Sequence, residues 1–150
     1  MINWYSLPFT ELSTQQLYQL LKLRVDVFVV EQTCPYPELD GKDTLTGVQH
    51  LLGYADEELV ACARLLPPGT TYDNASIGRV ATKQSARGDG LGHQLLKEAL
   101  TSCEGFWPGT AIDIGAQQHL ESFYKSHGFK TISEMYLEDD IPHVDMRLEK

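Results

Sequence analysis

The stretch Ile77-Gly78-Arg79-Val80-Ala81-Thr82, with Arg87-Gly88-Asp89-Gly90-Leu91-Gly92 soon after it, decides which fold we expect. The first half is mostly small and apolar, as in a short strand. The second half is rich in glycine, which is typical of a tight turn. From the turn onward, Leu91, Leu95 and Leu96 recur at helical spacing. The stretch therefore predicts a strand, a glycine-rich turn and a helix in direct succession.

A strand that leads through a glycine-rich turn into a helix is suited to binding phosphate. Glycine allows positive φ angles and lets a ligand approach the backbone. The free N–H groups and the dipole at the helix start attract anions, and Arg87 adds a forked guanidinium. Such turns also occur without a ligand, and His93 is either a further phosphate contact or exposed surface. The phosphate interpretation assigns contacts to Arg87, Gly88, Asp89, Gly90, Leu91, Gly92 and His93.

The glycine pattern distinguishes between three phosphate-binding templates. A Walker A loop ends in Gly-Lys-Ser/Thr, which does not occur here. A Rossmann fingerprint fails because Leu95 stands where Gly90-x-Gly92 would require another glycine. The remaining template, Arg/Gln-x-x-Gly-x-Gly/Ala after a mid-chain strand, is satisfied by Arg87, Gly90 and Gly92. The turn therefore resembles the pyrophosphate loop of the GNAT acyltransferase superfamily, and a nucleotide-binding α/β domain is disfavoured.

A second motif strengthens this resemblance. Members of the superfamily carry Tyr-x-x-x-Gly-Phe on a helix after the next strand, and Tyr124 to Phe129 match it. The resemblance implies that Tyr124 protonates the departing coenzyme thiolate, because a phenol is neutral at pH 7 and can donate its proton. The alternative is a core aromatic that shares a helical face with Leu120 and Phe123. The family often has asparagine seven residues before the tyrosine, where this chain has Gln117.

The resemblance extends over nearly the whole chain, and the chain is similar to the ElaA-like branch of the superfamily. Resemblance to that branch does not identify the amine that accepts the acetyl group. The segments that carry the likeness are Leu17 to Glu31 with Phe28-Val29-Val30-Glu31-Gln32, Cys34-Pro35-Tyr36, Asp40, Ile77-Gly78-Arg79-Val80, Gly115-Ala116-Gln117 and Ile141-Pro142-His143.

Periodicity along the rest of the chain predicts a single domain over residues 1–150. Ser13 and Gln16 form a capping box for a helix or helix pair that runs to about Glu31. Hairpins at both ends surround two strand–helix units, which indicates an α/β (α+β) fold with a mixed, mostly antiparallel twisted sheet and helices on both faces. The expected strands are Ile2–Leu7, His50–Ala55, Leu59–Leu66, Ser76–Thr82, Ala111–Gly115, Phe129–Leu137 and His143–Leu148, and the later helix is His119–His127.

Composition excludes several classes of protein. The formal charge of −9 argues against nucleic-acid binding, and it is compatible with a cationic acceptor or with simple solubility. Neither an apolar stretch long enough to cross a bilayer nor a secretory signal is found, so we expect a cytoplasmic protein without a membrane partner. Cys34, Cys62 and Cys103 form no CxxC pair, and no set of metal ligands is visible.

The resemblance also implies a cofactor path and a mechanism. Acetyl-CoA is the expected cosubstrate, with its pantetheine arm lying between two splayed strands as an extra strand. Val80, Ala81, Thr82 and Gln117 then contact the arm, and the Val80 N–H polarises the thioester carbonyl. An amine attacks directly and needs a base. The candidates for that base are Glu31, Asp40, His50, Asp113 and His143, with Glu31 and His143 ahead.

These inferences favour an acetyl-CoA-dependent N-acetyltransferase acting on the amine of a small molecule or peptide. Transfer to protein lysines or N-termini is the alternative within the same chemistry. A non-catalytic acyl-CoA sensor is the alternative from another class, and the intact Tyr124 argues against it. Relatives in the superfamily often dimerise, so the resemblance leaves a homodimer open.

Overall fold

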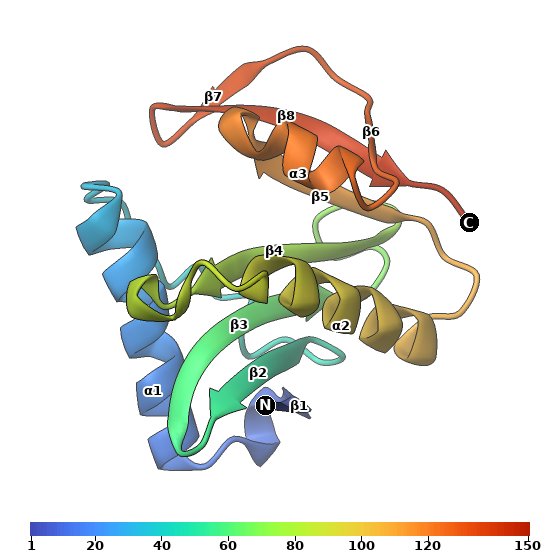
Figure 1. Ribbon diagram of the computed structural model, residues 1–150. Helices are drawn as coiled ribbons and strands as arrows, with labels where there is room; N and C mark the ends of the chain where they lie inside the picture. The colour runs from blue at the N-terminus through green and yellow to red at the C-terminus, as the bar shows by residue number, and fades with distance from the viewer.

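A computed structural model describes all residues, 1–150. One curved sheet carries helices packed against it (Figure 1). The helical elements are η1 (Phe9–Glu11), α1 (Thr14–Arg24), η2 (Val25–Glu31), η3 (Gln84–Ala86), α2 (Leu91–Phe106), η4 (Gln118–Leu120) and α3 (Glu121–Lys125). The strands are β1 (Ile2–Pro8), β2 (Gln49–Ala55), β3 (Glu58–Leu66), β4 (Ala75–Thr82), β5 (Ile112–Gln117), β6 (Lys130–Thr131), β7 (Tyr136–Glu138) and β8 (Ile141–Leu148).

The sheet is mixed and mostly antiparallel, as predicted. Its strand order is β1-β2-β3-β4-β5-β8-β6, and β7 also pairs with β8. The pair β4–β5 is parallel and every other pair is antiparallel. The single parallel pair follows from the helix α2, which carries the chain from one strand to the next in the same direction.

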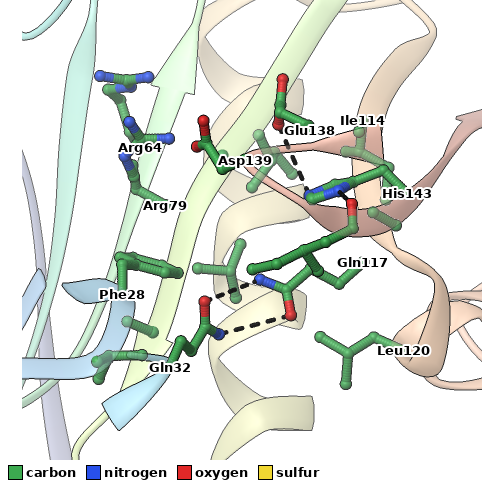
Figure 2. A pocket seen from close by; sticks show the side chains of 18 of the residues that line it. Phe28, Gln32, Arg64, Arg79, Ile114, Gln117, Leu120, Glu138, Asp139 and His143 are labelled. Atoms are coloured by element: carbon green, nitrogen blue, oxygen red, sulfur yellow. Dashed lines mark hydrogen bonds and ion pairs between the residues drawn. The ribbon is translucent and has the colours of Figure 1, made fainter. Parts of the chain in front are cut away.

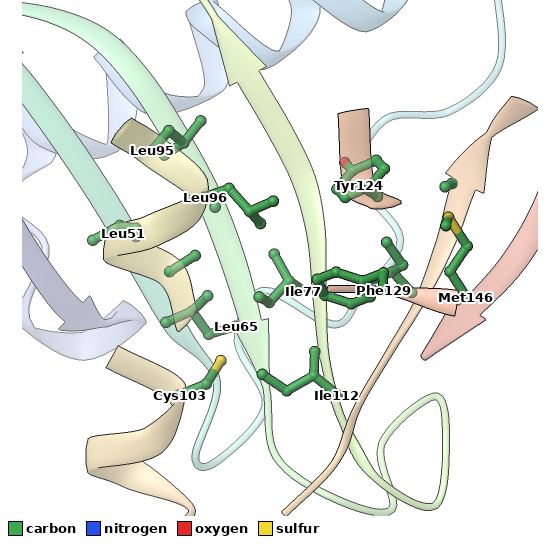
Figure 3. Close-up of a cluster of buried hydrophobic side chains, with 14 of the residues drawn as sticks. Leu51, Leu65, Ile77, Leu95, Leu96, Cys103, Ile112, Tyr124, Phe129 and Met146 are labelled. Carbon is green, nitrogen blue, oxygen red and sulfur yellow. The ribbon is translucent and has the colours of Figure 1, made fainter. Parts of the chain in front are cut away.

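Helices cover both faces of the sheet, which confirms the predicted layering. Side chains alternate along β2, so Leu51 packs into the core under α2 while Leu52 packs into the core under α1. The larger core gathers Leu95 and Leu96 of α2 with residues of the central strands, and it includes Phe129 (Figure 3). Because each face of the sheet is buried by its own helical layer, the central strands are rigidly held.

The first helical segment begins as predicted and then changes its winding. The Gln16 N–H donates to Ser13 Oγ over 3.0 Å and the Ser13 N–H donates to Gln16 Oε1 over 2.8 Å, so the capping box is confirmed. The α-helix α1 ends at Arg24 and continues as the π-helical segment η2 up to Glu31. π-helical turns are rare and are frequent at functional sites. Here the segment leads directly to the cleft described below.

The predicted strand Phe129–Leu137 is wrong, because the structure divides it into β6 and β7. Between them a side chain replaces a backbone carbonyl as hydrogen-bond acceptor: Ser133 Oγ accepts the Asp145 N–H over 2.8 Å. The ladder with β8 is therefore interrupted. The turn that follows is Asp139-Asp140, and Pro142 lies within β8.

Candidate active site

The site lies where the parallel strands β4 and β5 separate. They pair only at Ala75↔Ile112 and Ser76↔Asp113. Beyond that point the strands diverge, as the family resemblance implied, and a cleft of about 700 Å³ opens between them. The predicted cofactor residues that line it are Val80, Ala81, Thr82, Arg87 and Gln117, and the predicted catalytic residues that line it are Tyr124, Glu31 and His143.

The edge of β4 that faces the cleft has no strand partner beyond Ser76. Its N–H and C=O groups can therefore bond an extended chain inserted beside it. On its other side β4 carries a β-bulge, because the pair Cys62↔Ala81 is followed by Arg64↔Gly78 and β4 contributes one residue more than β3 over this interval. Arg79, inside the bulge, has a φ of 50°, which is uncommon for a residue with a side chain.

The glycine-rich turn presents a helix start without a side-chain cap. Gly88 and Gly90 have φ angles of 112° and 76°, a region that glycine occupies readily. Gly90 is the N-cap of α2, no side chain bonds to the first N–H groups of this helix, and its first turn has no acidic residue. These N–H groups are free for an anion. Residues 88–93 are not part of the cleft lining, so their phosphate contacts stay a prediction.

Arg87 lines the cleft and is bound by neighbouring protein groups. Its guanidinium donates to both carboxylate oxygens of Glu31, over 2.7 and 2.9 Å, and also to the Thr82 carbonyl over 2.8 Å. The guanidinium that the sequence analysis assigned to phosphate is therefore bound to protein groups. The hydrogen bond from Arg87 lowers the pKa of Glu31. A carboxylate with a lowered pKa takes up a proton less readily, so Glu31 is a weaker base than its position suggests.

His93 is also bound to protein. Its Nδ1 lies 2.8 Å from Nε2 of His127, and the two rings stack with centroids 5.0 Å apart. Burial lowers the pKa of His127. The pair links the first turn of α2 to the end of α3, next to the helix start that is free for an anion.

The position of Tyr124 is compatible with both interpretations considered for it. Its ring packs edge-on against Phe123 and Phe129 in the larger core, and the side chain is 6 % exposed (Figure 3). Tyr124 also lines the cleft, and its hydroxyl makes no hydrogen bond within the protein. Burial raises the pKa of Tyr124 to about 12. The phenol is therefore neutral at physiological pH and holds a proton that it can donate.

His143 faces the cleft from β8. Its Nδ1 lies 2.7 Å from the Ile141 carbonyl oxygen, and its Nε2 lies 3.6 Å from Glu138 Oε2 (Figure 2). Because a carbonyl accepts and cannot donate, Nδ1 carries the proton of the neutral ring and Nε2 keeps its lone pair. The ring stacks on Tyr136 with centroids 5.9 Å apart. His143 is thus held in one orientation with a basic nitrogen available.

Two glutamine amides meet across the cleft. The Gln117 amide donates to Gln32 Oε1 over 3.2 Å, and the Gln32 amide lies 3.5 Å from Gln117 Oε1 (Figure 2). Gln117 ends β5 and Gln32 follows η2. The pair thus joins the two walls of the cleft through Gln117, the side chain that was expected to contact the pantetheine arm.

The remaining base candidates have structural partners. His50 is buried outside the cleft with Nε2 3.0 Å from the Asp43 carbonyl, and burial lowers its pKa. Asp113 also lies outside the cleft lining and pairs with Arg147 over 2.6 Å. Asp40 lines the cleft, but both its carboxylate oxygens accept hydrogen bonds from Arg64 over 2.8 Å. Asp40 and Asp113 are held in ion pairs, and His50 and Asp113 lie outside the cleft, so none of the three is positioned to accept a proton from a substrate there.

Sequence reasoning missed a closed ring of alternating charges beside the cleft, which we call the ion ring. Three arginines and three carboxylates form it: Arg24, Glu38, Arg79, Asp40, Arg64 and Asp43. The carboxylates all come from the loop of residues 33–47. The length of that loop was the available signal, because long loops in compact domains are often functional, but nothing in the sequence pairs its acids with particular arginines.

Two further properties of the whole chain bear on function. No group of three or more His, Cys, Asp or Glu side chains is arranged to hold a metal ion. No helix has both the length and the apolar character needed to cross a membrane.

Comparison with known proteins assigns the family. The profile of the Acetyltransferase (GNAT) domain matches residues 23–150. The chain is 46 % identical to Protein ElaA of Escherichia coli strain K12 over 149 residues, which cover 99 % of this chain and 97 % of that protein. This chain belongs to the GNAT acyltransferase family. Its resemblance to the ElaA-like branch is confirmed by the same identity.

Solved structures of GNAT proteins agree with this fold. An acyl-CoA N-acyltransferase from Pseudomonas aeruginosa superposes with a TM-score of 0.94 at 45 % identity, covering 98 % of this chain and 99 % of that one. The structure of Escherichia coli ElaA superposes with a TM-score of 0.93 at 45 % identity, covering 99 % and 100 %. The GNAT acyl-CoA N-acyltransferase fold is therefore shown for the whole chain, and the splayed strands β4 and β5 are part of it.

Proposed function

We propose that this GNAT protein is an N-acetyltransferase that moves the acetyl group of acetyl-CoA to a primary amine on a small molecule or peptide. One observation carries the proposal: the unpaired edge of β4 and the unbonded hydroxyl of Tyr124 lie in one cleft, and the free helix start at Gly90 comes three residues after Arg87, which lines the same cleft. Each of these three features is suited to one part of a thioester cosubstrate.

The cofactor lies along β4 in this proposal. Its pyrophosphate takes the free N–H groups of the turn from Gly88 to Gly92, where the helix dipole favours negative charge. Its pantetheine arm bonds to the exposed edge of β4 at Val80 and Thr82, and Gln117 meets it from the opposite wall. This local arrangement is needed because the chain carries a net charge of −9 that repels an anionic cofactor.

The chemistry then needs no covalent intermediate on the protein. The neutral amine attacks the thioester carbon, and the Val80 N–H stabilises the oxyanion that forms. The C–S bond breaks as the intermediate collapses, and Tyr124 donates its proton to the departing thiolate. The attacking nitrogen loses a proton to a base, and Tyr124 is reprotonated from solvent.

His143 is the favoured base. Its Nδ1 proton is directed at the Ile141 carbonyl, which leaves Nε2 as a proton acceptor toward the cleft. Glu138 Oε2 lies 3.6 Å from Nε2, where the carboxylate can pair with the ring once a proton has been taken up. Glu31 serves this role less well because it is bound to Arg87 and its pKa is lowered by that bond.

Thermal unfolding with and without acetyl-CoA is the first test. A ligand at about 100 times its Kd stabilises the folded state by roughly 2.7 kcal/mol. We expect stabilisation of the wild type by acetyl-CoA, followed by release of free thiol when amines are added. Binding without thiol release over a broad set of amines, lysine peptides included, would favour an acyl-CoA sensor. No stabilisation at millimolar acetyl-CoA would refute the proposal.

A further inference from the structure

The ion ring closes without a gap. Its successive contacts run Asp43–Arg24, Arg24–Glu38, Glu38–Arg79, Arg79–Asp40, Asp40–Arg64 and Arg64–Asp43, with N–O distances of 2.7, 2.8, 2.6, 3.6, 2.8 and 3.1 Å. Every arginine has an acid on each side and every acid has an arginine on each side. The charges of the ring therefore cancel, and none of its members is left as a free charge in the cleft.

The ring joins one loop to the frame of the domain. Glu38, Asp40 and Asp43 all lie in the loop of residues 33–47, whereas the arginines come from α1, β3 and β4. Arg24 and Arg64 are 1 % and 4 % exposed, so their charges depend on these partners, since an unpaired buried charge is costly. Arg64 and Arg79 lie on the wall of the cleft opposite His143 (Figure 2).

Arg79 differs from the other arginines because its backbone lies in the β4 bulge. Its φ of 50° is unfavourable for an arginine and persists only where the surroundings hold it. The holding contacts come from Glu38: Arg79 Nε donates to Glu38 Oε2 over 2.6 Å, and Arg79 Nη2 donates to the Glu38 carbonyl over 3.3 Å. The guanidinium also lies 5.9 Å from the centre of the Phe28 ring. The side chain is thus fixed from two directions.

We propose that Arg79 is a positioning residue whose clamp on Glu38 fixes the β4 bulge so that the Val80 N–H points at the thioester carbonyl. The inference rests on the proposed function, because it assigns Val80 as the oxyanion donor. Val80 follows Arg79 directly, so the φ and ψ angles of Arg79 set the direction of the peptide N–H between them. Releasing the clamp lets Arg79 relax toward negative φ, and the donor then turns away from the carbonyl.

The test compares Arg79→Lys and Glu38→Gln with the control Arg147→Lys. Lysine keeps the charge at position 79 but cannot donate to the Glu38 side chain and carbonyl together in the fixed geometry of a fork. Arg147 forms a similar forked pair with Asp113, at 2.6 and 3.3 Å, outside the cleft. One readout is the infrared carbonyl stretch of bound acetyl-CoA carrying carbon-13 in the acetyl carbonyl. The other is kcat together with the KM for acetyl-CoA.

We expect the wild type and Arg147→Lys to lower the carbonyl frequency of the bound thioester equally, and Arg79→Lys to lower it less. The same variant should lose about ten- to a hundred-fold in kcat, since a donor misplaced by about 1 Å costs on that scale, with the KM for acetyl-CoA little changed. Glu38→Gln should change the carbonyl frequency and kcat in the same way as Arg79→Lys. The test can therefore still be made if one of the two variants does not fold.

Failure of this inference is separable from failure of the proposed function. If the wild type does not bind acetyl-CoA, the proposed function is lost and the inference with it. If the wild type binds and shifts the carbonyl, but both clamp variants shift it as far and turn over as fast, only the positioning role is overturned. An equal kcat loss in Arg147→Lys would also overturn it, because the effect would then be a general one of stability.

Discussion

The glycine-rich turn and the ion ring are built differently. The turn is local: residues 87–92 are consecutive, and the backbone N–H groups at the start of α2 are the proposed binding atoms. The ring joins side chains from Arg24 to Arg79, contributed by one helix, two strands and a loop. A local device is determined by a few neighbouring residues, whereas a distributed one exists only after the chain has folded. The two should therefore fail in different ways when they are mutated.

Breaking the ring should give the largest effect. Asp43→Asn removes a carboxylate that accepts hydrogen bonds from Arg24 over 2.7 Å and Arg64 over 3.1 Å, and both arginines are buried. Loss of one partner from a buried ion pair costs about 3–5 kcal/mol. We expect a decrease of that size in the free energy of unfolding at pH 7, measured by urea titration. The acetyl-CoA affinity, measured well below the melting temperature, should stay within about two-fold, since the turn is a separate device.

This loss should depend on pH in a defined direction. Burial acts to raise the pKa of Asp43, but its hydrogen bond with Arg24 and the nearby charges outweigh burial, and the net pKa is lowered. A lowered folded pKa gives stability that is present above about pH 3.9 and is lost as the pH falls through the folded value. The difference between wild type and Asp43→Asn should therefore narrow below about pH 4. A difference that is constant from pH 7 to pH 3 would contradict the ionic account.

Breaking the turn should cost less stability than breaking the ring, and it should weaken cofactor binding. Gly90→Val places a β-branched residue at a φ of 76° and disturbs the N–H groups at the start of α2. Gly69→Val is a matched control, because its φ is 88° and an added Cβ meets no atom within 4 Å at either position. Both variants should lose about 1–2 kcal/mol of stability. Only Gly90→Val should weaken acetyl-CoA binding, by about a hundred-fold; equal weakening in both would refute the phosphate turn.

Substitution of Tyr124 tests the proposed chemistry in the cleft. Tyr124→Phe keeps the ring in the core and removes a hydroxyl that has no protein partner, so stability should change little. A positioned acid contributes about 10²–10⁴-fold, and solvent can replace part of this, so we expect kcat to fall by about ten- to a hundred-fold with acetyl-CoA affinity retained. Tyr54→Phe, which loses a 2.9 Å hydrogen bond to Gln19 away from the cleft, is the control. Loss of binding with normal turnover would refute the role of Tyr124.

The same contrast explains what the sequence could predict. Most strands, the helices α1 and α2 and the capping box at Ser13 depend on local periodicity or on short motifs, and they were predicted correctly. The splay of β4 and β5 was implied by the family resemblance. The break after Thr131 was missed because a single side chain, Ser133, replaces a backbone partner. Tyr124 and His143, which were catalytic candidates from the sequence, both line the cleft. Their roles in catalysis stay predictions.

The contacts that the sequence could not predict all join distant segments. Arg87 was expected to face phosphate, yet its fork binds Glu31, which is 56 residues away in sequence. Arg79 has a positive φ that no property of arginine suggests. Composition gives the number of charges, but the pairing of charges is decided by how the elements pack. A long loop with several acids is a reason to look for such pairing, and it does not identify the partners.

The smallest expected effect concerns Gln32 and Gln117, which belong to opposite walls of the cleft. Their amide contacts of 3.2 and 3.5 Å join the side chain expected to hold pantetheine to the end of η2. The cofactor must compete with this contact, and a hydrogen bond between such groups is worth about 0.5–1.5 kcal/mol. Gln32→Ala should therefore tighten acetyl-CoA binding by roughly two- to ten-fold, whereas Gln117→Ala should weaken it, because the bond to the cofactor is lost as well. Calorimetric titration of both variants with acetyl-CoA measures directly whether the affinity rises or falls. Equal weakening in both would mean that the amide pair stabilises the bound state and that Gln32, too, belongs to the cofactor site.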